Sequence, residues 1–532
     1  MTASTKTFVR PASGLVRALS LTDCVIFQIG IAAFFAIAQM VAWVSSAYPG
    51  GDGAYAMLLC LVVFIPWMGL VYGLLGAAFP RSGGDYVYVS RILHPILGFV
   101  TNWAFTWAGI IVMGTIAGYV ILNAVAPTLF IAGVVSGSAD LINLGAWVGS
   151  AGLLPLGILF LAGLSFTHFL PMTKIRRLHQ FYFVLNVIWL VLIIGIFLVY
   201  SNADFVRTYN SYFGSTMSYD QVIAFAEKQG WQNMPATWAA SLPAMAMAYQ
   251  VYNGFNFIAY VGGEVKNAEK TIPQSIIISG VAFGLLCALM SFVTTRTVGT
   301  AFNNAINWLF WTKGNAVAGF SPFGNAFAAL LTGNVLIVAL IGFTMVVGGH
   351  FLNYSAYTLT LERNVFAWAF DRVVPTRMAY VSPRFHAPIV ATLFVLAGCI
   401  VFHLASLYTP YFFGYMNAIG MILIAVCITS IAAIVYPYRL RDQFEKAPGF
   451  VRAKVGGVPI ISLVGLVSAI VSIYLTYYSL FSGKTGPGSP EALALLAGVF
   501  VSGAVIHVVS TAYRKRVEGV DMKMAFKEIP PE

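Results

Sequence analysis

The chain has 532 residues, of which 59% are hydrophobic, 15% aromatic and only 9% charged. Soluble domains carry about 25% charged residues, so this composition excludes a soluble globular protein. A transmembrane β-barrel is also excluded, because its strands would read as short segments of alternating hydrophobicity. The apolar runs of this chain are instead long and continuous. The composition therefore predicts an all-α polytopic membrane protein.

Twelve apolar runs are long enough to cross a bilayer as helices. They lie near residues 22–47, 54–78, 96–130, 147–170, 180–200, 238–262, 274–296, 324–358, 387–406, 411–436, 457–481 and 491–513. The first run is too long for a signal-peptide core and lacks a small-residue cleavage site, so we expect it to be retained. The long connections 201–237 and 297–323 either fold over an outer vestibule or serve as linkers, and we favour linkers.

The basic residues test this count of spans. With the N-terminus inside, 24 of the 29 Lys and Arg residues fall in segments on the same side. Because Lys and Arg are retained in the cytoplasm during insertion, the bias predicts cytoplasmic tails at 1–20 and 514–532 in a cell-membrane protein. The net charge of +11 then reflects the basic residues of the cytoplasmic segments. We therefore expect contacts with anionic lipid and no nucleic-acid partner.

Reactive residues are sparse and scattered. The five cysteines lie within apolar runs without paired spacing, and no His, Cys, Asp and Glu residues cluster with catalytic or metal-ligand spacing. We therefore expect no enzymatic activity, no cofactor and no metal site. The oligomeric state stays open.

The run near 238–262 is interrupted by polar residues at membrane depth. Asn253, Gly254 and Asn256 stand inside it, and a Gly-Gly pair precedes Glu264 at its end. In hydrocarbon, irregular backbone survives only where it lines a cavity. Broken helices of this kind mark the binding sites of secondary transporters. We therefore predict that Asn253, Gly254 and Asn256 bind substrate.

Two other segments combine charges with turn or helix signals. In PRSGGDYVY (80–88), Gly83 and Gly84 permit a tight turn, and Asp85 is expected to neutralise Arg81 or Arg91. The segment 361–388 carries an apolar stripe with charged residues around it. That pattern favours an amphipathic helix lying at the membrane interface.

Three stretches resemble signatures of the amino acid–polyamine–organocation permeases. They are PRSGGDYVYVSRILHPILGF (80–99), GFNFIAYVGGEVKNAEKTIPQSI (254–276) and RNVFAWAFDRVVP (363–375), and the resemblance covers nearly the whole chain. It implies a leucine-transporter-type fold with two inverted five-helix repeats, at 21–200 and 238–438. An extracellular connection (201–237) would join the repeats, and two additional helices (439–513) would follow. Spans one and six would be broken around the substrate.

The resemblance also suggests roles for individual residues. Phe34–Ala38 stand where the family usually has a Gly-Ser-Gly-Ile-Phe-like break, and we expect them to form a continuous helix. Gly30, Ala32 and Ala33 are then the candidates for close approach to the substrate. The family often has Gly-Phe-Glu where this chain has Gly254-Phe255-Asn256, which implies that Phe255 is an aromatic gate. Glu264 would belong to a cytoplasmic gate.

The coupling ion, sodium or proton, is left open by the sequence. The resemblance puts Asn186 where some proton-coupled relatives carry a lysine in span five. Sodium would need oxygen ligands, but Thr344 and Ser355 in span eight form no tight pair. His350, with Asn353 on the same helix, is a candidate for proton relay or substrate binding, because ionisable residues at membrane depth are costly. The alternative is a neutral histidine bonded to backbone.

The leading interpretation is a secondary active transporter that moves an amino acid or related small amine by alternating access. The altered first span keeps a second interpretation open, a transporter of the same fold for a polyamine, a nucleobase or another metabolite. A non-transporting membrane sensor is a third class, disfavoured because neither tail exceeds a couple of dozen residues.

Overall fold

The structure is a computed structural model that describes residues 16–150, 154–314, 317, 319–385, 387–409, 415–482, 489–520, 522 and 526. The first half contains α1 (Leu21–Ala32), α2 (Phe35–Ala47), α3 (Gly53–Val63), α4 (Leu70–Ala78), α5 (Asp85–Ile92), α6 (Pro95–Val120), α7 (Ala126–Ser136), α8 (Ala139–Val148), α9 (Gly157–Thr167), α10 (Met172–Val199), α11 (Asn202–Phe213) and α12 (Tyr219–Lys228). The second half contains α13 (Trp238–Tyr252), α14 (Ala268–Val298), α15 (Thr300–Lys313), α16 (Gly324–Thr332), α17 (Val335–Phe343), α18 (Phe351–Phe370), α19 (Ile389–Tyr408), α20 (Tyr415–Arg439), α21 (Arg441–Lys446), α22 (Ile460–Leu480) and α23 (Pro490–Tyr513). The only strands in the described ranges, β1 (Lys454–Val455) and β2 (Val458–Pro459), form one small antiparallel hairpin.

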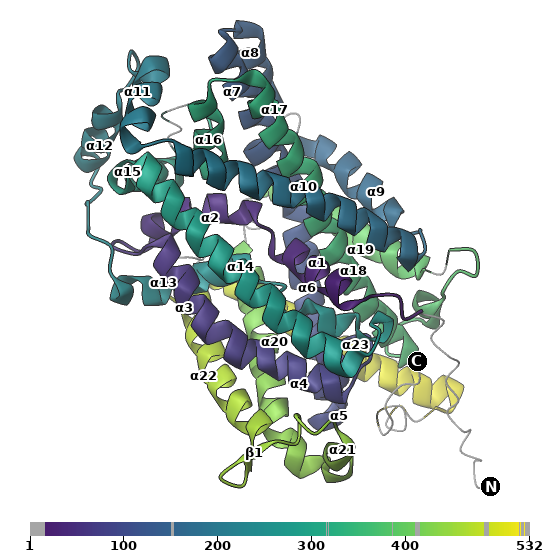
Figure 1. Cartoon of the computed structure of the whole chain (residues 1–532). Coiled ribbons are helices and arrows are strands. Elements are labelled where there is room, and N and C mark those ends of the chain that lie inside the picture. Colours follow the sequence, from purple (N-terminus) through teal and green to yellow (C-terminus); the bar gives the residue numbers. More distant parts are fainter. Residues whose placement is uncertain are drawn as a thin grey trace, which may run out of the picture.

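Ten helical segments in the described part of the chain are long and apolar enough to cross a membrane. Several consist of two α-helices joined through a π-helical turn, as α17 and α18 are through Thr344–His350. The other two predicted spans, near 147–170 and 238–262, correspond to the shorter helices α9 and α13. The protein is therefore an all-α multi-pass membrane protein, as its composition predicts. Figure 1 shows α11, α12 and α15 together at one end of the bundle, and α5 and α21 at the opposite end.

The first span is broken, as the resemblance implies, and the break lies just before the stretch that we expected to be helical. α1 ends at Ala32, Ala33 has φ 62° and ψ 101°, and α2 begins at Phe35. Positive φ is uncommon for a residue with a side chain. The prediction of helix is right from Phe35 onward, but the interruption lies just before it. Contacts from a distant helix hold this break, because the Asn353 side chain donates hydrogen bonds to the backbone oxygens of Gly30 and Ile31.

The second break lies in span six and contacts the first. α13 ends at Tyr252, Gly254 has φ +113°, and the chain continues through short 3-10 turns before α14 begins at Ala268. A Cβ atom on Gly254 would lie 2.0 Å from Cγ2 of Ile31 in α1. Only glycine therefore satisfies both the backbone conformation and the close approach of the two broken spans.

Backbone hydrogen bonds tie the inner half of span six to its surroundings. Glu264 O accepts from the N–H groups of Ala18 and Leu19 at 2.9 Å, and Lys266 N donates to Leu19 O at 2.9 Å. The 80–88 turn adds a further bond, from Gly83 N to Tyr260 O at 2.8 Å. The irregular backbone after the break is thus satisfied by the segment before α1 and by the turn before α5.

The connections predicted to be linkers are helical and packed. α12 contacts α15, and the rings of Tyr219 and Phe302 stack with centroids 4.3 Å apart. α15 in turn packs on α2. These contacts could not be read from sequence, because each helix covers its apolar face only by meeting a partner from another segment.

The predicted interfacial helix at 361–388 is also wrong. Its first ten residues continue α18, and Leu361–Ala369 are all buried. The charged side chains are neutralised by distant partners, Arg363 by Glu264 at 2.5 Å and Asp371 by Arg91 at 2.7 Å. The second pair also overturns the expectation that Arg91 neutralises Asp85. An amphipathic pattern cannot distinguish a helix that faces lipid headgroups from one whose charges find buried partners.

We predict that Gly254→Ala lowers the stability of the protein by at least about 2 kcal/mol, because the methyl group overpacks against Ile31 and strains the backbone. Thermal unfolding in detergent measures the effect. Gly195→Ala in α10 is the matched control, since no heavy atom lies within 4 Å of its Cβ position. That control should gain up to about 1 kcal/mol from helix propensity. Equal melting temperatures for the two variants would contradict the contact between the breaks.

Candidate functional site

A cavity of about 80 Å³ lies between the two broken spans. Its wall combines both breaks with residues of α6, α15 and α18. The lining residues are Ile31, Ala32, Ala33, Phe35, Ala36, Trp43, Val112, Met113, Thr115, Ile116, Tyr119, Gln250, Val251, Asn253, Trp311, Asn353 and Tyr357. The breaks therefore do what irregular backbone at membrane depth must do, which is to border a cavity.

Two asparagines supply polar groups to this cavity. Asn353 donates from Nδ2 to the backbone oxygens of Ile31 at 2.7 Å and Gly30 at 3.4 Å, which are carbonyls at the end of α1. Asn253 donates from Nδ2 to the hydroxyl of Tyr357 at 3.0 Å. The Oδ1 atoms of both asparagines accept no hydrogen bond from the described residues. They are acceptors in the wall of the cavity that a ligand N–H group could use.

The electrostatics of the wall are as informative as its shape. No Asp, Glu, Lys, Arg or His stands among the described residues that line it. An ion with net charge would therefore enter without a counter-charge, at a large desolvation cost. A molecule of zero net charge, including a zwitterion, can be held by amide groups and helix ends alone.

Aromatic side chains separate this cavity from a second one. The indoles of Trp43 in α2 and Trp311 in α15 stack with centroids 5.0 Å apart. Tyr119 and Trp311 line both the first cavity and a larger one of about 530 Å³ among α6, α7, α8 and α15. Sequence reasoning missed both tryptophans. Trp311 lies in a connection, and nothing in its neighbouring residues signals that it reaches span one.

The opposite end of span one is held by ion pairs. Glu264 Oε1 accepts from Arg363 Nε at 2.5 Å, with both side chains buried. At the start of α1, Asp23 lies 3.6 Å from Arg176 and accepts a hydrogen bond from Gln180 at 2.7 Å. Because Asp23 and Trp43 stand at opposite ends of the broken span, the cavity lies between an aromatic pair and an ionic cluster.

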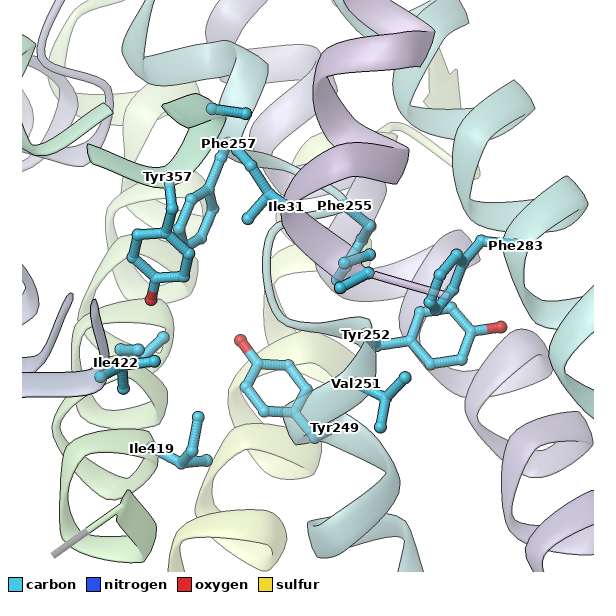
Figure 2. Packing of buried hydrophobic residues seen from close by; sticks show 14 of the residues in the cluster. Ile31, Tyr249, Val251, Tyr252, Phe255, Phe257, Phe283, Tyr357, Ile419 and Ile422 are labelled. Atoms are coloured by element: carbon cyan, nitrogen blue, oxygen red, sulfur yellow. The ribbon is translucent and has the colours of Figure 1, made fainter. Parts of the chain in front are cut away.

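The structure separates the predicted site residues into two groups. Ala32, Ala33, Asn253 and Asn353 line the cavity, whereas Gly30, Gly254, Phe255, Asn256 and His350 do not. The ring of Phe255 is directed toward Tyr252, at 6.1 Å between centroids, and Tyr252 packs against Phe283 at 5.6 Å (Figure 2). Roles in substrate binding or gating stay predictions for both groups.

The predicted coupling residues lie behind the first break. The His350 ring packs 3.8 Å from the Phe35 ring, and Asn186 lies against Gly348 and Gly349 in the π-helical turn. Among the described residues, neither ring nitrogen of His350 and neither polar atom of the Asn186 side chain has a hydrogen-bond partner. In the same part of the chain, no group of three or more His, Cys, Asp and Glu residues is arranged to hold a metal.

Asp85 forms a separate polar site at the start of α5. Its carboxylate accepts from Asn102 Nδ2 at 2.6 Å and from the Tyr260 hydroxyl at 3.0 Å. Asn102 accepts in turn from Trp368 Nε1 at 2.6 Å. Complete burial raises the pKa of Asp85 from its usual 3.8 to about 7, although the bonds from Asn102 and Tyr260 oppose the shift. The first residue of α5 thus carries a buried carboxyl with a raised pKa, and this carboxyl contacts Tyr260 of span six.

Comparison with known proteins identifies the family. Residues 14–504 match the family model described as amino acid permease. The chain belongs to the amino acid permease family. It is 24% identical over 451 residues to the branched-chain amino acid permease BcaP of Bacillus subtilis, covering 81% of this chain and 83% of BcaP. It is 25% identical over 369 residues to the glutamate/serine transporter AimA of the same species, covering 68% of this chain and 61% of AimA. It is 26% identical over 339 residues to the human Asc-type amino acid transporter 1, covering 61% of this chain and 53% of the human transporter.

The amino acid permease assignment and the geometry support each other. A permease needs a small-molecule site that opens alternately to the two sides of a membrane. Here the cavity borders both broken spans, and the stacked Trp43 and Trp311 form part of its wall. The family match also agrees with the prediction of a transporter, which three short stretches suggested.

We predict that Asn353→Leu destabilises the permease by about 1–3 kcal/mol, because the carbonyls of Ile31 and Gly30 lose their donor in a buried position. Thermal unfolding in detergent measures the loss. Asn233→Leu, at an exposed position, is the matched control and should leave the melting temperature nearly unchanged. Similar melting temperatures for both variants would show that Asn353 does not hold the break.

Asp85 predicts a pH dependence of stability with a defined sign. Its folded-state pKa of about 7 lies above the usual 3.8, so the unfolded chain releases this proton at lower pH. The carboxyl therefore costs no stability below about pH 4, and an increasing amount as the pH rises to about 7. The ceiling for this cost is about 4 kcal/mol. Asp85→Asn should raise the melting temperature relative to the parent more at pH 8 than at pH 5.

Asp204→Asn supplies a control of opposite sign. Hydrogen bonds from Ser201 lower the pKa of the exposed Asp204 carboxyl. Its stabilising contribution is present above its usual pKa and is lost as the pH falls through the lowered value. Replacing it should therefore reduce stability at neutral pH and matter less in strong acid. A difference between Asp85→Asn and the parent that stays constant with pH would contradict the assignment of Asp85.

Proposed function

We propose that this permease transports a neutral, zwitterionic amino acid with an apolar side chain. The observation that carries the proposal is the uncharged wall of the cavity between the breaks, taken with the family. Ile31, Val112, Met113, Ile116 and Val251 supply apolar surface, and polar groups are confined to the neighbourhood of the breaks. The similarity to BcaP, a branched-chain amino acid permease, agrees with this substrate class.

The helix ends suggest how a zwitterion is oriented. α2 begins at Phe35 in the cavity wall, and the positive end of its dipole favours a carboxylate there. α1 ends at Ala32 and α13 at Tyr252, so their negative ends favour an ammonium group nearby. The free Oδ1 atoms of Asn253 and Asn353 would accept from that ammonium group.

A polycation is less well matched to this wall. A polyamine would bring two or more ammonium groups into a cavity without a carboxylate, at a desolvation cost that amides repay only in part. A nucleobase lacks the paired charges that the helix ends would recognise. The amino acid therefore remains the substrate that the geometry favours.

The proposed transport cycle uses the Trp43–Trp311 pair and the Glu264–Arg363 pair as its two gates. The positive-inside bias puts both termini, and therefore the Glu264–Arg363 end, in the cytoplasm. Trp43 and Trp311 would then form the outer gate, in place of the Phe255 gate that the resemblance implies. The inverted repeats at 21–200 and 238–438 would rock against one another around the breaks, with 201–237 outside and 439–513 at the periphery.

The substrate class is tested with purified permease in liposomes, by exchange of labelled amino acids across the membrane. We expect leucine, isoleucine, valine or methionine to exchange, and lysine and glutamate not to exchange. The uncharged wall is the physical reason, since an extra charge would be unpaired in the cavity. Exchange of lysine or glutamate with no exchange of apolar amino acids would overturn the proposed class.

The location of the site is tested by filling the cavity. Met113→Trp should weaken binding of the exchanged amino acid by about tenfold or more, because about 1.4 kcal/mol of clash suffices for that change. Leu285→Trp, at an exposed position on α14, is the control and should bind like the parent. Unchanged affinity in a folded Met113→Trp protein would place the site elsewhere.

A further inference from the structure

A chain of four buried polar side chains joins α9, α10 and α18. His168, which follows α9, lies with Nδ1 2.6 Å from Glu362 Oε1 and with Nε2 2.8 Å from the hydroxyl of Ser355. The same hydroxyl lies 2.8 Å from Nε2 of His179 in α10. All four side chains are at least nine-tenths buried. Neither histidine was singled out from the sequence.

The hydroxyl of Ser355 makes this chain able to conduct a proton. A hydroxyl has one hydrogen, so it donates to one imidazole Nε2 and accepts from the Nε2–H group of the other. When His168 is neutral, His179 donates to Ser355 and Ser355 donates to His168. When His168 is an imidazolium, both bonds run in the opposite direction. The change between the two states is the transfer of one proton along the chain.

A charge count at the Glu362 end shows why a proton belongs there. Arg363 lies 2.5 Å from Glu264 and 3.8 Å from Glu362, so one guanidinium faces two buried carboxylates. Oε2 of Glu362 accepts no hydrogen bond from the described residues. Burying a net charge costs several kcal/mol, whereas a single proton on the His168–Glu362 pair makes the cluster neutral.

The other titratable groups around this hydrogen-bonded chain do not change the net charge of the cluster. Asp23 and Arg176 neutralise one another beside His179. Tyr354 in α18 bonds to the hydroxyl of Ser165 at 2.9 Å, and Cys399 in α19 lies near Tyr354 and Glu362. Phenol and thiol groups are neutral unless strongly activated, so they leave the balance of the cluster unchanged.

The hydrogen-bonded chain of side chains begins at His179, beside a small cavity at the proposed cytoplasmic end. That cavity, of about 10 Å³, is lined by Leu19, Asp23, Ile26, Phe27, Met172, Arg176, His179 and Leu359. His179 is therefore the member of the hydrogen-bonded chain that lines this cavity, and Glu362 is the member beside the ion pairs. The path from His179 to Glu362 runs through the three hydrogen bonds given above.

We propose that His179, Ser355 and His168 form a proton wire that loads one proton onto the His168–Glu362 pair, and that this proton holds the inner gate closed. A proton that binds His179 at Nδ1 moves the Nε2 hydrogen of His179 to Ser355 and the Ser355 hydrogen to Nε2 of His168. Release runs the same steps backward and returns the proton to water. The site is distinct from Asn186 and His350, where the sequence placed coupling.

The consequence for the gate follows from the charge count. With the proton bound, the cluster of Glu264, Glu362, Arg363 and His168 is neutral and stays buried. Without it, the cluster carries one uncompensated negative charge, which favours opening of the inner end and entry of water. Each opening of the inner gate therefore releases one proton, so acid slows the cycle. This inference rests on the proposed function, because it gives the gate of a permease its pH response.

The test uses exchange of a labelled neutral amino acid in liposomes, with both faces at the same pH and the pH varied from about 5 to about 9. The exchange rate of the parent should fall on the acid side, approaching about tenfold per pH unit, because one proton must leave before the gate opens. Glu362→Gln removes the surplus carboxylate, so the cluster is neutral without a bound proton. Its acid inhibition should be absent or reversed.

Two further variants keep the test decisive. His168→Gln leaves only the carboxyl to bind the proton, so its acid inhibition should begin at lower pH than in the parent. His507 is a buried histidine in α23 that does not belong to the hydrogen-bonded chain, so His507→Gln should keep the pH profile of the parent. Acid inhibition that is the same in the parent, Glu362→Gln and His168→Gln would overturn the proton site.

Binding measurements separate this inference from the proposed function. Equilibrium binding of the labelled amino acid in detergent, at one neutral pH, should be similar in the parent and Glu362→Gln, since neither Glu362 nor His168 lines the cavity. If both variants bind and exchange the amino acid but keep the pH profile of the parent, only the proposed proton site is contradicted. Failure of the parent to bind or exchange any neutral amino acid defeats the proposed function itself.

Discussion

Carbonyl groups that end a helix inside a membrane must find donors, and this requirement organises the centre of the permease. α1 ends at mid-membrane, and the side chain of Asn353 donates to two of its last carbonyls. The break in span one is therefore held by span eight rather than by its own sequence. Gly254 completes the arrangement, because its missing side chain lets span six approach Ile31.

Span eight connects this centre to the ionic end of the bundle. Asn353 and Tyr357 border the cavity, while Glu362 and Arg363 lie farther along the same helix. An α-helix rises about 1.5 Å per residue, so Glu362 stands roughly 8 Å along the helix from Tyr357 and roughly 14 Å from Asn353. A change in the ion pairs and a change at the break are thus linked through one packed helix, which is the kind of element that carries coupling between sites.

The distribution of charge divides the molecule into regions with different tasks. The cavity wall has no Asp, Glu, Lys, Arg or His among its described residues, whereas ion pairs gather where Asp23, Glu264 and Asp371 lie. A neutral substrate can pass an uncharged wall without a counter-ion. Closed ion pairs can be broken only when water replaces the lost partner, which makes them suited to a gate that opens to one side.

The sequence by itself determined the fold class, the positions of the spans and the break at Gly254, because these depend on local composition, on apolar run length and on one glycine. It also found Asn253 and Asn353, since an amide inside an apolar run is costly wherever it lies. It did not place the break of span one at Ala33, and it did not find the stacking of Trp43 on Trp311 or the hydrogen-bonded chain from His179 to Glu362. Each of these joins residues from segments far apart in the chain. Only the tertiary structure decided them, because a hydrogen bond or a ring contact is set by distance in space, which no local pattern records.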